Sequence, residues 1–125
     1  MSNGKPEPAS GLAAAVLRVL SERVGQENAI RRAELVERVS DLLWADDQPA
    51  TTDRAVRDSI ADLRLQGWLI ANLGTGYFLT NTRAEIEAFL AQERSRARQV
   101  EAGLRALERA AETQFAEWKQ MGLKL

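Results

Sequence analysis

The stretch from Gly67 to Thr80, GWLIANLGTGYFLT, constrains the fold more than any other part of the sequence. Apolar and aromatic residues flank Gly74 and Gly76, and glycine supplies the backbone freedom that a tight hairpin turn needs. Residues along a strand alternate between its two faces. The stretch therefore predicts one β-hairpin, with Ile70, Tyr77 and Leu79 on one face and Leu69, Ala71 and Phe78 on the other.

Both faces of this hairpin carry apolar side chains. If Ile70, Tyr77 and Leu79 point to the core, Leu69, Ala71 and Phe78 point away from it. Exposed apolar side chains clustered on one sheet face usually mark a buried contact. We expect either the C-terminal helix or a second subunit to cover them.

Helical spacing dominates the rest of the chain. Ahead of the hairpin, apolar residues recur at intervals of three and four in the ranges 10–24, 33–44 and 52–66. Thr51 or Thr52 can cap the third helix, and an extended piece at 29–31 precedes the second. The expected fold class is mainly α with one β-hairpin, followed by a long C-terminal helix.

No proline interrupts residues 83–119, and Thr82 and Glu85 match a capping box at the start of this segment. The resulting helix would be roughly 55 Å long, against a body roughly 25 Å across for the residues before it. A coiled-coil-like seam of apolar residues runs along it. We therefore expect a homodimer through this helix, with an interaction surface that also includes the outer hairpin face: Leu69, Phe78, Val100, Leu104, Leu107, Phe115 and Trp118.

Composition limits the function. The 125 residues include no Cys and no His, so we expect no catalytic residues, no metal site and no cofactor. The longest apolar run near the start, 11–17, is too short for a membrane span, which favours a soluble cytoplasmic protein. Lys plus Arg number 17 against 18 Asp plus Glu. Any contact with DNA must therefore come from a local basic patch.

The order of three helices and a hairpin, together with the run RAVRDSIADLRLQGWLI (54–70) and the return strand GYFL (76–79), resembles a winged helix-turn-helix. It is similar to the N-terminal DNA-binding domain of bacterial biotin repressors and to small phage and prophage proteins with that domain. The resemblance covers about residues 12–79. Together with the composition and helical pattern outside that range, it predicts these segments: a flexible leader (1–9), a winged helix-turn-helix domain (10–81), a helix for dimerisation or packing (82–120) and a tail (121–125).

By this resemblance, the third helix would enter the major groove of DNA and the hairpin, or wing, would touch the backbone or minor groove. Arginine can bond guanine in bidentate fashion, and threonine hydroxyls can hold phosphate. The expected DNA-binding residues are Arg31, Arg32, Thr51, Thr52, Arg54, Arg57, Asp58, Ala61, Arg64 and Thr75. Arg54 and Arg57 are the first choices for base or phosphate contact.

Two features of the sequence depart from this family. Asp53 and Asp58 lie among the arginines of the third helix, and the wing tip from Leu73 to Gly76 has no Lys or Arg. Because phosphate neutralisation dominates most non-specific affinity, a monomer should bind DNA weakly. The leading hypothesis is a sequence-specific DNA-binding dimer, as a transcriptional regulator or phage-type protein. The alternative is a protein-interaction module without DNA contact, serving as an adaptor or inhibitor of a larger assembly.

Overall fold

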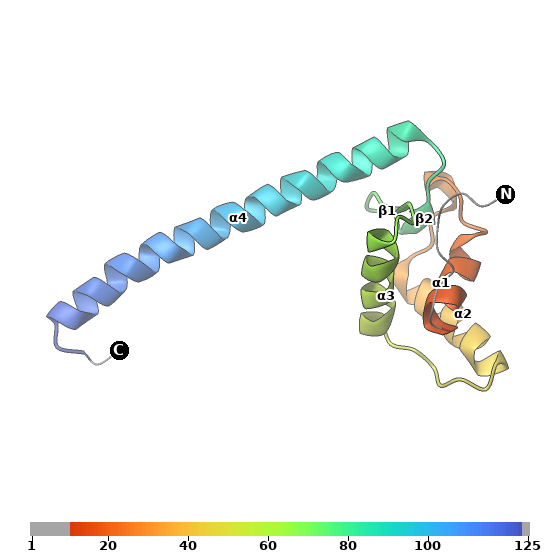
Figure 1. Ribbon diagram of the computed structural model, residues 1–125, viewed down its shortest axis with the longest axis horizontal. Coiled ribbons are helices and arrows are strands. Elements are labelled where there is room, and N and C mark those ends of the chain that lie inside the picture. The colour runs from red at the N-terminus through yellow and green to blue at the C-terminus, as the bar shows by residue number, and fades with distance from the viewer. Residues whose placement is uncertain (1–10, 124–125) are drawn as a thin grey trace. The chain divides into compact units, whose positions relative to one another are not determined.

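The computed structural model describes residues 11–123 of the chain. Over this range the elements are helix α1 (Gly11–Leu20), 3-10 helix η1 (Gln26–Asn28), helix α2 (Arg32–Ala45), helix α3 (Asp53–Leu65), strands β1 (Ile70–Asn72) and β2 (Tyr77–Leu79), and helix α4 (Arg83–Gln120) (Figure 1). The predicted fold class is confirmed: the chain is mainly helical, with one hairpin and a long C-terminal helix. The predicted leader, 1–9, lies outside the described residues.

The chain divides into two compact units, of which the first ends at Phe89 and the second begins at Leu90. The sequence placed the boundary at residue 81, before α4. The first unit instead includes the first two turns of α4, because Phe89 is buried with residues of the hairpin. We refer to the described part of this unit, residues 11–89, as the hairpin domain.

The main core of the hairpin domain lies between α1, α2, α3 and one face of the hairpin. Each helix contributes residues that recur three and four positions apart, which places them on one side of the helix. The fully buried members are Val16, Leu20, Ile30, Leu35, Val39, Val56, Ile60, Leu63 and Ile70. Burying one such aliphatic side chain stabilises the folded state by about 1.5–3 kcal/mol.

The hairpin has the predicted facing of its side chains. Ile70 pairs with Leu79 and Ala71 with Phe78 in an antiparallel register. The chain before α2 also joins it: Ile30 exchanges two backbone hydrogen bonds with Tyr77, at N···O distances of 2.8 and 2.9 Å. Gly76 has a φ of 127°, and a Cβ there would collide with the Ile30 carbonyl, so this close approach requires glycine.

The first helix is shorter than the sequence predicts, because α1 ends at Leu20 and not near Val24. Val24 forms a β-bridge with Leu79 instead. The Arg23 carbonyl accepts a hydrogen bond from Leu79 N–H, and the Leu79 carbonyl accepts one from Gly25 N–H, both at 2.9 Å. Hydrogen bonds to the outer side of β2 therefore compete with, and replace, the last turn of the predicted helix.

A second apolar cluster covers the other face of the hairpin. Ala71 and Phe78 are completely buried there, together with Phe89, and Ile86 packs against them. Of the two covers that the sequence left open, the start of the C-terminal helix is the one present. Phe78 is consequently not part of an accessible interaction surface, whereas Leu69 stays exposed.

The capping box at Thr82 and Glu85 forms in part. The Thr82 hydroxyl accepts a hydrogen bond from Glu85 N–H at 3.3 Å, as predicted. The Glu85 carboxylate instead reaches to Gln26 N–H at 2.8 Å and to the Thr80 hydroxyl at 2.7 Å. The Gln26 N–H first, and the Thr80 hydroxyl second, hold the pKa of Glu85 below its usual value. This carboxylate joins the start of α4 to η1 and to the end of the hairpin.

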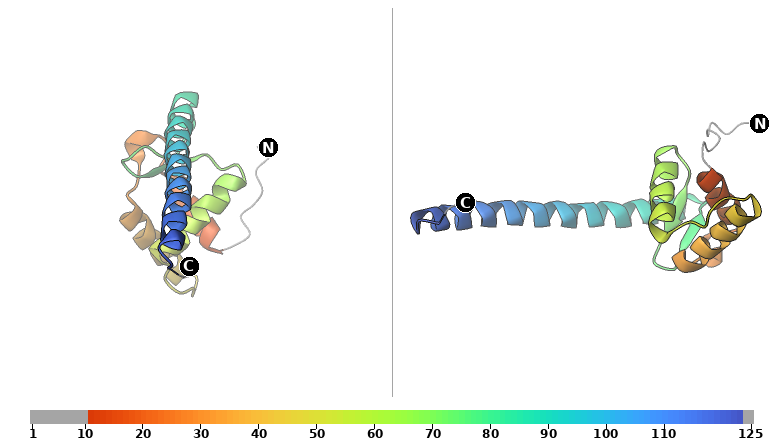
Figure 2. Two further views of the ribbon diagram at one scale, coloured as in Figure 1. Left: turned by 90° about the vertical axis from the view of Figure 1, so that its left-hand side faces the viewer. Right: turned by 90° about the horizontal axis from the view of Figure 1, so that it is seen from below.

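The second unit consists of the remainder of α4 and the turn after it. Figure 2 shows α4 as one uninterrupted ribbon. From Leu90 to Leu123, within the described chain, no residue is buried. No helix among residues 11–123 combines the length and apolar character needed to cross a membrane.

Candidate nucleic-acid interface

Helix α3 is anchored at its start and along its inner side. The Thr52 hydroxyl accepts a hydrogen bond from Ala55 N–H at 3.1 Å, so Thr52 is the N-cap of the two that the sequence left open, Thr51 and Thr52. Val56, Ile60 and Leu63 are buried beneath the helix. The opposite side of α3 is solvent-exposed, and we call this the α3 ridge: Arg54, Asp58, Ala61 and Leu65.

A basic edge lies on one flank of the α3 ridge. Arg57 Nε is 3.0 Å from Asp53 Oδ2, and Arg32 Nε, from the start of α2, is 2.6 Å from Asp53 Oδ1. Asp53 therefore holds two guanidinium groups from two helices side by side. Arg31 is exposed next to Arg32. The basic edge therefore consists of four arginines near the N-terminal ends of α2 and α3: Arg31, Arg32, Arg54 and Arg57.

These ion pairs are open to solvent and weak. The Arg54 side chain is 88% exposed, and its Nε is 4.0 Å from Asp58. Exposed ion pairs contribute about 0–1 kcal/mol each. A phosphate group can therefore replace Asp53 or Asp58 as the partner of an arginine at small cost. The aspartates lower the positive potential of the basic edge without blocking access to it.

Arg64 has a structural role that the sequence did not reveal. Its Nε donates a hydrogen bond to the Ile70 carbonyl at 2.7 Å. Its guanidinium carbon lies 4.7 Å from the centre of the Phe89 ring and 6.0 Å from that of Tyr77. These contacts direct its guanidinium toward the hairpin and the start of α4. A DNA contact by Arg64 stays a prediction.

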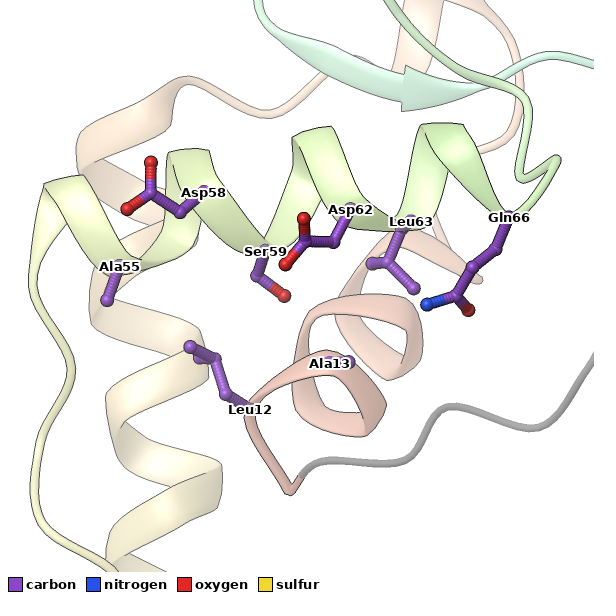
Figure 3. Close-up of a pocket in the computed structure, with 8 residues that line it drawn as sticks. All are labelled: Leu12, Ala13, Ala55, Asp58, Ser59, Asp62, Leu63 and Gln66. Carbon is purple, nitrogen blue, oxygen red and sulfur yellow. The ribbon is translucent and has the colours of Figure 1, made fainter.

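The other flank of the α3 ridge is acidic. An open pocket of about 440 Å³ lies between the start of α1 and this side of α3. Figure 3 shows Ser59 and Asp62 of α3, and Gln66 just after it, lining the pocket, with Leu12 and Ala13 of α1 across from them. Asp58 and Asp62 would repel a phosphate backbone here. Any nucleic acid on α3 would therefore lie toward the basic edge.

The wing offers little to a polyanion. Thr75 is exposed at its tip, as predicted, and the Asn72 side chain accepts a hydrogen bond from Gly74 N–H at 2.9 Å. A surface hollow next to Thr75 is lined by Glu27 and Glu85. Thr51, a further predicted contact, is half-buried, and its N–H donates to the Ser40 hydroxyl at 3.2 Å. The basic edge is thus the best-formed part of the predicted DNA surface.

The structure also reveals an apolar residue on the α3 ridge that we did not predict as a site. Leu65 is 87% exposed. It follows Arg54 by eleven residues, or about three helical turns, so helical periodicity alone places it on the same side. A second surface lies on α4, where the predicted Val100, Leu104, Leu107, Phe115 and Trp118 are all exposed.

Residues 11–123 contain no group of three or more Asp or Glu arranged to hold a metal ion. No family model matches the chain, and neither a curated protein nor a solved structure matches it. The chain's own residues are therefore the basis for a function.

Proposed function

We propose that the hairpin domain is a winged helix-turn-helix that binds double-stranded DNA sequence-specifically, as a dimer formed through α4, in transcriptional control or a phage-type process. The observation that carries this proposal is the exposed ridge of α3 with Arg54 and Arg57 accessible beside Arg31 and Arg32. A helix anchored on its inner side and open on its outer side can enter a major groove.

The position of each arginine on the domain gives it a different proposed DNA contact. Arg54 projects from the N-terminal end of the α3 ridge, and recognition helices contact base edges with their N-terminal residues. Its guanidinium fits guanine O6 and N7. Arg57 and Arg32 lie on the flank, where the phosphate backbone passes. Thr52 and the free N–H groups at the start of α3 add donors for a phosphate oxygen. A phosphate contact by Arg32 or Arg57 requires that arginine to leave Asp53, at about 0–1 kcal/mol.

A single hairpin domain should bind DNA with low affinity. The wing carries no cation at its tip, and Asp53 and Asp58 reduce the positive field of α3. Two domains on one duplex multiply their effective affinity without any new contact. This supports a dimer as the DNA-binding form.

The test is a selection from random duplexes, followed by binding measurements between low and moderate salt. We expect enrichment of a defined sequence and an affinity that falls as salt rises. The double variant Arg54→Gln/Arg57→Gln should lose the enrichment. Arg83→Gln is a matched control, because Arg83 is 86% exposed and has an (i, i+4) acidic partner like Arg54. The proposal fails if no sequence is enriched, or if both variants behave alike.

A protein-interaction function is the second candidate, and Leu65 favours it. An exposed leucine on the α3 ridge, flanked by Asp58 and Asp62, suits a protein partner better than a phosphate backbone. This alternative predicts a stoichiometric protein complex that Leu65→Lys disrupts and Arg57→Gln leaves intact. It is rejected if Leu65→Lys has no effect on any complex while the duplex selection succeeds.

A further inference from the structure

The second unit carries a regular heptad pattern from residue 97 to residue 121. Residues of the first register position, a, are Ala97, Leu104, Ala111 and Trp118. Residues of the other seam position, d, are Val100, Leu107, Gln114 and Met121. These eight positions alternate at spacings of three and four over about three and a half heptads, which is the length at which such a pattern indicates a coiled coil. We call them the α4 seam.

The α4 seam has no cover within the described second unit. Leu107 is 68% exposed, and Val100, Leu104 and Met121 are likewise exposed. In proteins, most helical stability comes from packing of an apolar face against another element. A helix with this seam gains that stability when a second helix covers it.

The seam and its flanks are complementary to themselves. Alanines at 97 and 111, with Gly103 and Ala110 on the flank next to the a positions, allow two identical backbones to approach closely. Gln114 is the one polar residue of the seam, and in a symmetric pair the two Gln114 amides meet in the same layer and can bond each other. A polar residue at one seam position is a common means of fixing register.

Charge determines the orientation of the two copies. Two positions of the heptad flank the seam: e lies four residues after a, and g lies one residue before a. In a parallel pair, each g position faces the e position five residues later in the other copy. Arg96 then faces Glu101 of the other copy, twice by symmetry, and no like charges meet. Within one copy, Arg96 pairs with Glu93 at 3.2 Å and Glu101 with Arg105 at 3.1 Å, which are surface contacts that can be extended or exchanged.

An antiparallel pair of the same layers is less favourable. In an antiparallel pair, residues 97–121 of one copy would run against the same residues of the other copy in reverse, with residue 109 at the centre. The e positions of one copy then face the e positions of the other. The two copies of Glu108 would then approach each other, and Glu101 would face Phe115. Like charges opposite each other disfavour the pairing.

We infer that the α4 seam binds a second copy of this chain as a parallel, in-register, two-stranded coiled coil over residues 97–121. The two hairpin domains are then attached at the same end of the coil. One consequence rests on the proposed DNA binding: the preferred DNA site is then an inverted repeat, because the symmetry of the site follows the two-fold symmetry of the protein.

Single cysteine substitutions can test the orientation, since the chain has no cysteine of its own. In a parallel in-register pair, identical seam residues lie opposite each other. Val100→Cys and Met121→Cys should therefore each form disulfide-linked dimers under mild oxidation. Ala102→Cys, on the outward side of α4, is the matched control and should not, because its two copies point apart. The wild-type chain should sediment at twice its own mass.

Three outcomes would overturn the inference. A monomeric mass in solution removes the pairing, and a trimeric or larger mass excludes two strands. Cross-linking only when Val100→Cys is mixed with Trp118→Cys indicates an antiparallel pair. The assay contains no DNA, so cross-linking that persists while the duplex selection fails rejects the proposed function alone. Enrichment of a single half-site by a monomer rejects the pairing, and with it the dimeric form of the proposed function, but leaves DNA binding by the hairpin domain standing.

Discussion

The hairpin domain and the second unit both contain apolar residues at helical spacing, but only the hairpin domain buries them. Its two apolar clusters combine side chains from helices, strands and connecting segments that are far apart in sequence. The α4 seam is drawn from one helix, whose residues cannot turn toward each other. A single helix can align an apolar surface but needs another element to cover it. The difference separates the part of the chain that buries its own apolar residues from the part for which we propose a partner.

The largest expected effect tests the completeness of the hairpin domain. Phe78→Ala removes a completely buried ring between β2 and α4 and should lower the free energy of unfolding by about 3–5 kcal/mol. Leu69 directly precedes β1 but is exposed, so Leu69→Ala should lower the free energy of unfolding by about 0.5 kcal/mol or less. Urea denaturation measures both. Equal losses would show that the start of α4 does not cover the hairpin in solution.

The next effect tests the need for a partner. Leu104→Ala should leave the hairpin domain folded but weaken association of the chain by about 2–5 kcal/mol, because each copy loses a seam leucine. Arg109→Ala shortens a side chain on the outward side of α4 and is its control. Sedimentation equilibrium over a range of concentrations gives the dissociation constants. If Leu104→Ala and Arg109→Ala associate equally well, the seam is not the contact.

Two arginines of α3 compare the internal contacts of the hairpin domain with its exposed surface. Arg64→Gln loses a charged hydrogen bond and the ring contacts with Phe89 and Tyr77, so we expect a loss of about 1.5–3 kcal/mol in unfolding free energy. Arg57→Gln, seven residues earlier, should change stability by about 0.5 kcal/mol or less. Thermal denaturation compares the two. A stable Arg64→Gln protein would contradict the structural role given to Arg64.

A smaller effect concerns the basic edge itself. Asp53→Asn frees Arg32 and Arg57 from their shared carboxylate and should strengthen DNA binding by roughly 0.5–1 kcal/mol. The same change removes a favourable charge from the first turn of α3, at about 0.3–1 kcal/mol of stability. Fluorescence anisotropy with a labelled duplex at low salt reports the affinity. Asp46→Asn, in the loop between α2 and α3, should bind like the wild type.

The smallest effect is the pH dependence at Glu85. Because the folded-state pKa of Glu85 lies below its ordinary value of 4.5, its contribution to stability is full at neutral pH and is lost as the pH falls through the folded-state pKa. The stability difference between the wild type and Glu85→Gln should be constant near pH 7 and shrink in the acid range below 4.5. Melting temperatures at a series of pH values measure it. A difference that stays constant down to pH 3 would contradict these contacts.

Local patterns in the sequence were sufficient for several features. Alternation between Ile70 and Leu79 predicted the facing of the hairpin, and the spacing of Val56, Ile60 and Leu63 predicted the inner side of α3. The absence of proline predicted a helix over 83–119, close to the observed Arg83–Gln120. Arg54 and Arg57 were placed on the exposed side of α3 by the same periodicity.

Contacts between distant segments decided the rest. The end of α1 at Leu20 depends on hydrogen bonds from residues 23–25 to β2. The role of Arg64 depends on Phe89, and that of Glu85 on Gln26, which is 59 residues away. Periodicity and turn chemistry act over a few residues and therefore appear in the sequence itself. The partner of a charged side chain is chosen by which segments meet in space, and only the tertiary structure contains that information.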